Sequence, residues 1–198
     1  MTNSAISYRY LPRAACTVEP WKNGLGSTDI IAEERIGNVA GEGWDGLVWR
    51  LAATEIPTAL PFSDHSGYER HQVVIEGEGL YLDTPSGTID LSTPLKPVRY
   101  GGELKIISRP EKGAVKVLNL MLDRSLATGE MAVLTAEADS EFPAGTHLVS
   151  AVAGDAPALV QGVEIDIVEG DTVALEIESA VSIAIRSGSA VVSSIYRI

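Results

Sequence analysis

The segment with the most side chains able to do chemistry runs from residue 61 to residue 79 and combines histidine, arginine and acidic residues. Arg70 carries a planar guanidinium, a fork of donors that matches a carboxylate and stays charged at any relevant pH. His71 follows it, with an imidazole that titrates near neutral pH. The competing interpretation is an ordinary surface ion pair between Arg70 and Glu69 or another of the many acidic residues, and the residue types alone favour that interpretation.

A metal site would require two imidazoles and a carboxylate directed at one point. His65 and His71 are six residues apart across an expected turn, and the third histidine, His147, lies far along the chain. No His-x-His pair occurs in the sequence. We therefore expect no metal and no other cofactor, and histidines that are exposed or structurally paired.

A second candidate is the glycine-rich segment 20–29, which contains Trp21, Lys22 and Asn23. Asn23-Gly24 favours a turn, because both residue types tolerate backbone conformations closed to most others. In the functional interpretation the backbone amides and Lys22 face a ligand, whereas composition alone favours a purely structural turn. The Gly-x4-Gly-Lys-Ser/Thr spacing of a phosphate-binding loop is absent.

Nucleophilic catalysis has little support in the sequence. There is no Gly-x-Ser-x-Gly, and Cys16 stands in an undistinguished Ala-Ala-Cys-Thr context. Since it is the single cysteine, it cannot close an intramolecular disulfide, so nothing indicates an oxidising compartment. The alternating acidic pairs Glu164/Asp166 and Glu176/Glu178 are best interpreted as the solvated faces of strands.

Composition limits the classes of partner. The chain has 198 residues, 45% of them hydrophobic, and a formal net charge of −12. An acidic surface repels phosphate backbones and anionic lipid, so we expect no nucleic-acid and no membrane partner. The N-terminus lacks the apolar core of a signal peptide, and no window approaches the roughly 20 apolar residues of a spanning helix. These features predict a cytoplasmic protein whose partners are small molecules or proteins.

Alternation of apolar and polar residues with period two is the dominant pattern along the chain, and it predicts strands with one buried face. The predicted strands are 47–51, 72–75, 79–82, 115–121, 163–167, 173–178 and 181–186. The 19 glycines and 10 prolines are spread between them as turns, which is typical of a sandwich or barrel. No clean helical stripe occurs, and residues 124–138 are expected to be irregular. The prediction is an all-β chain.

The composition changes near residue 125. All three tryptophans and five of the six tyrosines lie before it, whereas the rest of the chain is rich in Ala, Val, Ile and Ser. Ligand pockets favour aromatic walls with a few polar groups. The first part of the chain, residues 1–125, is therefore the expected location of a site.

Several of these segments together resemble the HutD/Ves family of cupin-fold proteins. They occur in the order found in that family and cover roughly residues 18–125: Pro20-Trp-Lys-Asn-Gly-x-Gly-x-Thr28, Trp49-Arg-Leu-Ala52, Pro61-Phe-Ser63, Gly67-Tyr-Glu-Arg70, Glu76-Gly-Glu-Gly79 and Leu118-Asn-Leu-Met-Leu-Asp-Arg124. Residues 126–198 match only in their alternating pattern.

The resemblance implies two cupin-like (RmlC-like jelly-roll) β-barrels in one chain, a half at 1–125 with the pocket and a smaller half at 126–198. It also implies an association with bacterial histidine utilisation. Members have no established catalytic activity and are thought to bind a small acidic metabolite of the formylglutamate type and to restrain induction of the pathway. A homodimer is a further expectation.

The pocket arginine of the family corresponds to Arg70, which strengthens its assignment as a carboxylate anchor. The expected ligand-binding set contains no catalytic residue and comprises Arg70, His71, Lys22, Asn23, Trp21 and Trp49. The two tryptophans would help to wall the pocket.

An enzyme is the alternative. It would be a metal-free isomerase or hydrolase of the cupin type, acting on a sugar or an acyl-amino acid. His71 would serve as the base, assisted by Glu69 or Tyr68.

Overall fold

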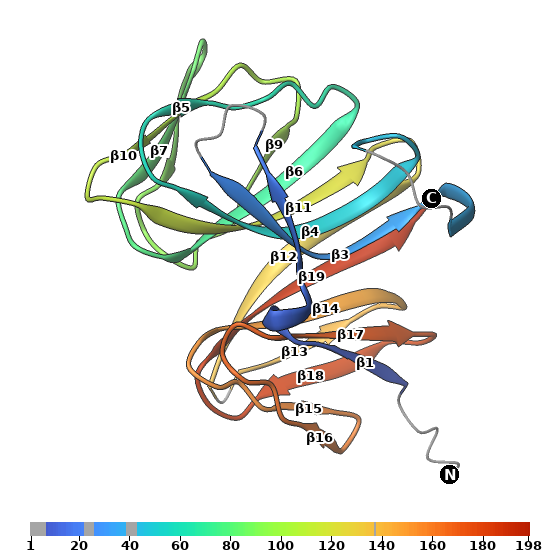
Figure 1. The fold of residues 1–198 in the computed structure, drawn as a ribbon. Helices are drawn as coiled ribbons and strands as arrows, with labels where there is room; N and C mark the ends of the chain where they lie inside the picture. The colour runs from blue at the N-terminus through green and yellow to red at the C-terminus, as the bar shows by residue number, and fades with distance from the viewer. Residues whose placement is uncertain (1–6, 22–25, 39–42, 137) are drawn as a thin grey trace. The chain divides into compact units, whose positions relative to one another are not determined.

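The structure is a computed structural model that describes residues 7–21, 26–38, 43–136 and 138–198 (Figure 1). Within these ranges the chain is almost entirely β-strand, and the helical segments are two short 3-10 turns, Arg13–Ala15 and Ile36–Asn38. The prediction of an all-β chain is confirmed. In the part of the chain that the structure describes, no helix has the length and apolar character needed to cross a membrane.

The chain divides into two compact units. The first unit comprises Cys16–Thr128 together with Ile198, and the second comprises Met1–Ala15 together with Gly129–Arg197. Each unit contains one larger and one smaller β-sheet.

The first unit holds a six-stranded and a four-stranded sheet whose neighbouring strands pair antiparallel. The six-stranded sheet has the order β2 (Thr17–Pro20), β3 (Ser27–Arg35), β4 (Leu47–Ile56), β11 (Val115–Asp123), β6 (Tyr68–Glu76) and β9 (Val98–Gly101). The four-stranded sheet has the order β5 (Leu60–Pro61), β10 (Ile107–Pro110), β7 (Leu80–Thr84) and β8 (Gly87–Leu91). One apolar cluster takes side chains from both sheets: Ile56, Val74, Tyr100, Val115 and Val117 from the larger, Leu80, Leu82 and Leu91 from the smaller.

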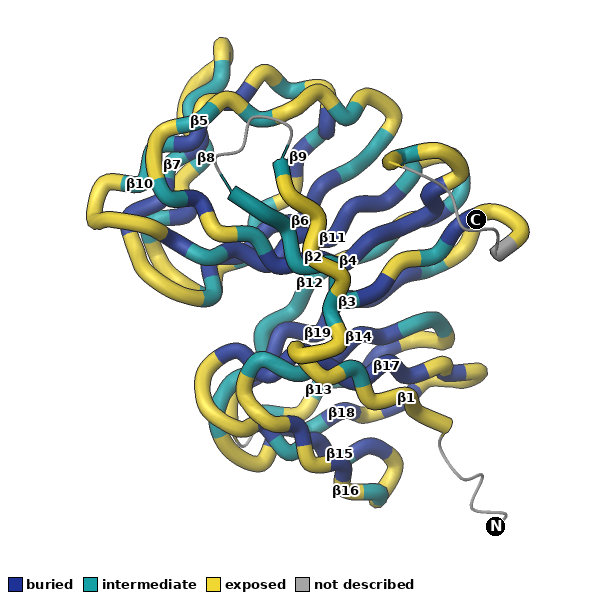
Figure 2. Tube along the Cα trace, in the orientation of Figure 1, coloured by how far each residue is buried: buried dark blue, intermediate teal, exposed yellow. Residues whose placement is uncertain are grey.

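Strands β4 and β11 are buried along most of their length rather than on alternate residues (Figure 2). Both lie in the interior of the six-stranded sheet, with paired neighbours on either side. A strand covered on both faces has an almost continuous apolar sequence. This explains why 47–51 and 115–121 carry so few polar residues, and it makes a buried arginine such as Arg50 conspicuous.

The second unit holds a five-stranded and a four-stranded sheet. The five-stranded sheet has the order β1 (Tyr8–Leu11), β17 (Thr172–Ile177), β14 (Gly145–Ala153), β19 (Ser189–Arg197) and β12 (Ala127–Thr135). The four-stranded sheet has the order β13 (Asp139–Phe142), β18 (Val181–Ile185), β15 (Ala158–Val160) and β16 (Val163–Ile165). The core takes Val149, Leu175 and Val192 from the first sheet and Phe142 and Ile183 from the second.

The three alternating runs near the C-terminus form β16, β17 and β18, as predicted. Their acidic residues Glu164, Asp166, Glu176 and Glu178 are exposed, as expected for solvated faces. The expectation that 124–138 is irregular is wrong, because most of that segment forms β12. Its Ala, Gly and Glu residues have low β-propensity, so pairing in the sheet, which the sequence alone does not reveal, decides its structure.

The Glu76-Gly-Glu-Gly79 motif is the turn between β6 and β7. Gly77 and Gly79 both have φ of 78°, which favours glycine. A Cβ added at Gly77 would lie 2.7 Å from the carbonyl oxygen of Ala114, a clash with backbone that cannot move freely.

We expect Gly77→Ala to lower the free energy of unfolding by about 1–3 kcal/mol, measured by urea denaturation. Gly113→Ala is the matched control, since Gly113 also has positive φ (102°) but has no heavy atom within 4 Å of an added Cβ. Equal losses in the two variants would contradict the assigned clash.

Candidate ligand-binding site

One face of the six-stranded sheet carries two buried arginines in a single row. Arg50 on β4 pairs with Met121 on β11, Met121 pairs with Arg70 on β6, and Arg70 pairs with Tyr100 on β9. Residues directly opposite one another on paired strands share a face. We call this the arginine face. The same face, four to six residues farther along β4, β6 and β11, contributes to the core between the two sheets of the first unit.

Arg70 is a buried guanidinium that no carboxylate of the described residues neutralises. Its side chain lies over the rings of Phe62 (4.8 Å to the ring centroid) and Tyr100 (5.3 Å), and the residue is 9% exposed. Nη2 donates one long hydrogen bond, 3.4 Å, to Asn119 Oδ1, and Nε has no partner. Among the described residues no carboxylate lies within ion-pair distance of it. Because an uncompensated buried charge is costly, this arrangement favours binding of an anion.

A second unpaired donor lies beside Arg70. Gln72 is fully buried two residues farther along β6, so it projects from the same face. The Tyr100 hydroxyl donates to Gln72 Oε1 at 2.6 Å, which orients the amide and leaves Nε2 without an acceptor. Buried donors are nearly always satisfied in folded proteins, so two orphans on neighbouring positions mark a place suited to acceptor atoms.

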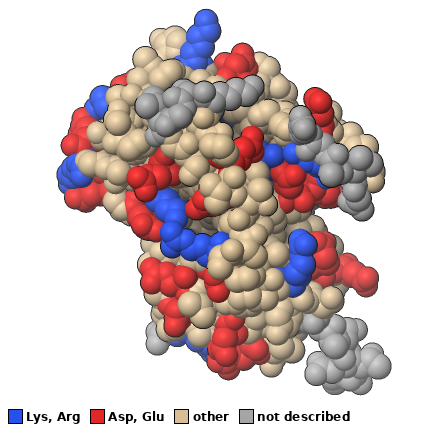
Figure 3. All heavy atoms as spheres, viewed as in Figure 1, with Lys and Arg blue, Asp and Glu red and all other residues tan. Residues whose placement is uncertain are grey.

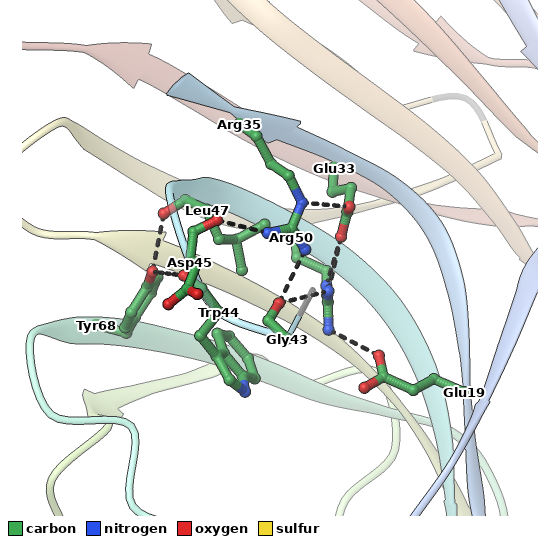
Figure 4. A network of polar contacts seen from close by, with 9 residues as sticks. All are labelled: Glu19, Glu33, Arg35, Gly43, Trp44, Asp45, Leu47, Arg50 and Tyr68. Atoms are coloured by element: carbon green, nitrogen blue, oxygen red, sulfur yellow. Dashed lines mark hydrogen bonds and ion pairs between the residues drawn. The ribbon is translucent and has the colours of Figure 1, made fainter. Parts of the chain in front are cut away.

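Arg50 is held differently, in a network with acidic partners (Figure 4). Its Nε and Nη2 both lie 2.8 Å from Glu33 Oε2, and Nη1 lies 3.2 Å from Glu19 Oε2. Nη2 also donates a long hydrogen bond, 3.4 Å, to the carbonyl oxygen of Gly43. The guanidinium lies 5.1 Å from the centroid of the Trp44 ring. Arg50 is therefore neutralised by two glutamates, whereas no described carboxylate neutralises Arg70.

Glu33 connects Arg50 to a third arginine. Its Oε1 accepts from Arg35 Nε at 2.8 Å, while Arg35 also donates to the carbonyl oxygens of Asp45 and Gly43 at 2.7 and 2.8 Å. Burial acts to raise the pKa of Glu33, but the hydrogen bonds from Arg35 and Arg50 outweigh it, so the pKa lies below its ordinary value. Glu33 is thus a firmly ionised link between two guanidinium groups.

The ring of His65 packs against that of Trp44 in a tilted arrangement, with ring centroids 4.2 Å apart and an interplanar angle of 45°. Burial and, next, the charge of Arg70 lower its pKa to about 4; Asp64 opposes this shift and Arg50 adds to it. The imidazole is therefore neutral at pH 7, and the positive charge of the site belongs to the arginines.

We expect the folded protein to keep His65 unprotonated until the pH falls to about 4, as followed by NMR titration of the imidazole. An unfolded histidine titrates near 6.5, so between these values the unfolded state binds more protons and stability declines as the pH is lowered. His65→Gln should remove this part of the slope. A folded-state titration near pH 6.5 would contradict the assigned environment.

Two of the residues predicted to bind ligand lie on the arginine face: Arg70 and Trp21. Trp21 Nε1 donates to Thr28 Oγ1 at 3.0 Å, and Thr28 pairs with Thr54, four residues along β4 from Arg50. A Cβ added at Gly26 would lie 3.0 Å from the Trp21 ring, so glycine at this position lets the indole pack closely.

Two other predicted residues, His71 and Trp49, lie on the opposite face of the same sheet. Each is adjacent in sequence to a residue of the arginine face, and side chains alternate along a strand. His71 Nε2 lies 3.2 Å from Glu69 Oε1, and Trp49 Nε1 donates to Glu34 Oε2 at 2.7 Å. Lys22 and Asn23 lie outside the described residues. The structure thus places Arg70 and Trp21 on one face of the sheet and His71 and Trp49 on the other.

Other residues of the arginine face were not predicted. They are Trp44, Arg50, Phe62, Gln72, Tyr100 and Asn119. Arg50, Phe62 and Asn119 stand inside the segments that carry the family resemblance, and Arg50 interrupts an apolar run, so a signal was present. Within the described ranges, no three His, Cys, Asp or Glu side chains group closely enough to hold a metal ion.

The chain is similar in sequence to a protein from Pseudomonas putida. An uncharacterised 21.2 kDa protein in the hutC 3′ region of Pseudomonas putida is 32% identical over 102 residues, which are 52% of this chain and 51% of that protein. The alignment thus spans only about half the length of this curated relative.

Two solved structures match along nearly the whole chain. A conserved protein of unknown function from Pseudomonas aeruginosa has a TM-score of 0.82 at 23% identity, covering 96% of this chain and 98% of that one. HutD from Pseudomonas fluorescens, in a formate condition, has a TM-score of 0.79 at 24% identity, covering 97% and 100%. At these identities the structures show the fold, which is cupin-like.

The HutD family profile matches residues 13–193, nearly the whole chain and both of its units. This match agrees with the resemblance carried by the motifs around Trp21, Trp49, Arg70 and Asn119. The chain belongs to the HutD family.

Proposed function

We propose that this protein binds a small carboxylate of the formylglutamate type through Arg70 and, without chemistry of its own, modulates histidine utilisation. The observation that carries the proposal is the guanidinium of Arg70, buried on the arginine face with its Nε unpaired and no carboxylate in ion-pair distance among the described residues. Membership of the HutD family and a relative in a hutC 3′ region support the metabolic context.

The physical argument concerns the charge of Arg70. A guanidinium that is withdrawn from water and left unpaired lowers the stability of the unliganded protein. A carboxylate restores the lost interactions through charge-assisted hydrogen bonds, which contribute roughly 1.5–3 kcal/mol. The rings of Phe62 and Tyr100 are stacked on the guanidinium, so its edge is the part available for hydrogen bonding.

The overall charge of −12 does not oppose this binding. Carboxylates are spread over the visible face of the molecule (Figure 3). Salt screens exposed charges beyond about 8 Å at physiological ionic strength, whereas buried charges are screened much less. The guanidinium of Arg70 therefore dominates the potential felt by an anion that reaches it.

The arrangement of the whole chain is part of the proposal. Each unit would close as a cupin-like jelly-roll barrel, with the ligand inside the first. The protein would act in the cytoplasm, as a homodimer, where it would sense an intermediate of the pathway.

The test is calorimetry and thermal unfolding of the wild-type protein with N-formylglutamate, glutamate, formate and a neutral amide analogue. At 100 times its dissociation constant, a ligand adds about 2.7 kcal/mol of stability. For a chain of this size the melting temperature should rise by about 5–10 °C. If none of the acids shifts the transition, or the neutral amide shifts it equally, the proposal fails.

The enzymatic alternative is checked in the same samples by following product formation with NMR. His71 and Glu69 project from the face opposite Arg70, whereas Tyr68 lies on the arginine face and donates to the carbonyl oxygen of Leu47 at 2.8 Å. The three side chains therefore do not converge. Turnover that depends on His71 would favour the enzyme, and binding without product favours the binding protein.

A further inference from the structure

Arg50 binds two glutamates that are held very differently. Glu33 contacts the guanidinium twice at 2.8 Å and also accepts from Arg35 at 2.8 Å. Glu19 contacts it once, at 3.2 Å from Nη1. The side chain of Glu19 is 49% exposed, against 29% for Glu33. Glu33 is therefore a fixed partner of Arg50, and Glu19 is a loosely held one.

A loosely held, half-exposed carboxylate can be exchanged for another. Ion pairs of this kind have little net stability, because water solvates the free carboxylate nearly as well. Glu19 belongs to β2, the edge strand next to β3 in the six-stranded sheet. It contacts Nη1 of Arg50, the guanidinium nitrogen that Glu33 does not contact. Departure of Glu19 would leave this nitrogen ready for an oxygen from outside the chain.

Arg50 and Arg70 also belong to one continuous surface. Both pair with Met121, so their Cα atoms are two strand spacings apart, roughly 10 Å. Trp44 lies beside Arg50, and its ring also contacts His65. Two guanidinium groups at this spacing on one face suit the two ends of a short dicarboxylate.

We propose that Arg50 forms a second carboxylate site, filled by Glu19 in the unliganded protein and taken over by the second carboxylate of a bound dicarboxylate. This inference rests on the proposed function, in which the first carboxylate binds Arg70. It makes Glu19 a specificity-determining residue: its carboxylate competes with dicarboxylates and leaves monocarboxylates unaffected.

The test compares N-formylglutamate with N-formylglutamine, which has the same shape but an amide in place of one carboxylate. Calorimetry gives both dissociation constants for wild type, Glu19→Gln and Glu19→Ala. We expect each variant to tighten binding of N-formylglutamate about fivefold relative to N-formylglutamine, the upper range for loss of an exposed ion pair. Glu55→Gln, the same charge change at an exposed β4 position on the opposite face, should leave the ratio unchanged.

The outcomes distinguish failure of the second carboxylate site from failure of the proposed function. If wild type binds neither compound, the proposed function fails and the second site fails with it. If both compounds bind through Arg70 but the ratio does not change in either Glu19 variant, or changes equally in Glu55→Gln, the proposed function stands and the second carboxylate site is wrong.

Discussion

Replacing Arg70 by methionine should abolish most carboxylate binding and at the same time stabilise the unliganded protein. Methionine keeps apolar contact with Phe62 and Tyr100 but removes a buried charge that no described carboxylate neutralises. Loss of the charge-assisted hydrogen bonds should weaken binding of N-formylglutamate about 10- to 150-fold. Loss of the unpaired charge should raise the free energy of unfolding by about 1 kcal/mol.

Opposite effects on binding and stability distinguish a ligand anchor from a structural arginine. Arg109→Met is the matched control, because Arg109 also lies over an aromatic ring, Tyr81 at 4.8 Å, but its side chain is 41% exposed and paired with Asp83. It should leave binding unchanged and lower stability by 0–1 kcal/mol. Calorimetry and urea unfolding measure both quantities. An Arg70→Met protein that binds as wild type does, or that loses stability like a core variant, would contradict the assignment.

Glu33→Gln should destabilise the first unit by about 2–4 kcal/mol. The amide cannot neutralise Arg35 and Arg50, which are 8% and 6% exposed, so two buried guanidinium groups lose their shared counter-charge. Breaking a buried pair by removing one partner is costly because the other charge stays buried. The partial exposure of Glu33 places the expected loss at the lower end of the range for such pairs.

The carboxylate of Glu33 also makes the free energy of unfolding depend on pH in the acid range. Because its folded pKa is lowered, Glu33 contributes stability above its unfolded pKa, near 4.5, and this contribution is lost as the pH falls through the folded value. Urea unfolding at a series of pH values should show a shallower acid loss in Glu33→Gln than in wild type. Glu55→Gln, with no described ion pair, should stay within about 0.5 kcal/mol of wild type. If Glu33→Gln and Glu55→Gln lost similar free energies of unfolding, Glu33 would not be the link between Arg35 and Arg50.

The strands with one buried face were predictable from the alternation of their residues. Alternation identified β16, β17 and β18 because apolar and charged residues take turns along them. Alternation failed to predict β12, because its small and partly buried residues show no clear two-residue period. There, pairing in the sheet decides the conformation. Local sequence therefore sufficed where burial is one-sided.

The candidate site was predictable residue by residue but not as a group. Arg70 was identified from its chemistry and its motif. His71 was grouped with it because the two are adjacent, yet adjacency on a strand places side chains on opposite faces, and β6 begins at Tyr68 rather than at Gln72. Arg50 joins Arg70 only through the register of β4, β11 and β6, which depends on pairings far apart in sequence.

The pairing of β1 with β17 has a consequence for biosynthesis. Tyr8 lies opposite Leu175, so β1 adds to a sheet whose other described strands come from residues 127–197 (Figure 1). A ribosome adding about 5–20 residues per second needs roughly ten to thirty seconds between these two positions. During that interval the first strand has no partner, while the strands of the first unit emerge complete. The order of synthesis thus opposes the order of assembly, because the sheet of the second unit can be completed only after β17 has been made, long after β1.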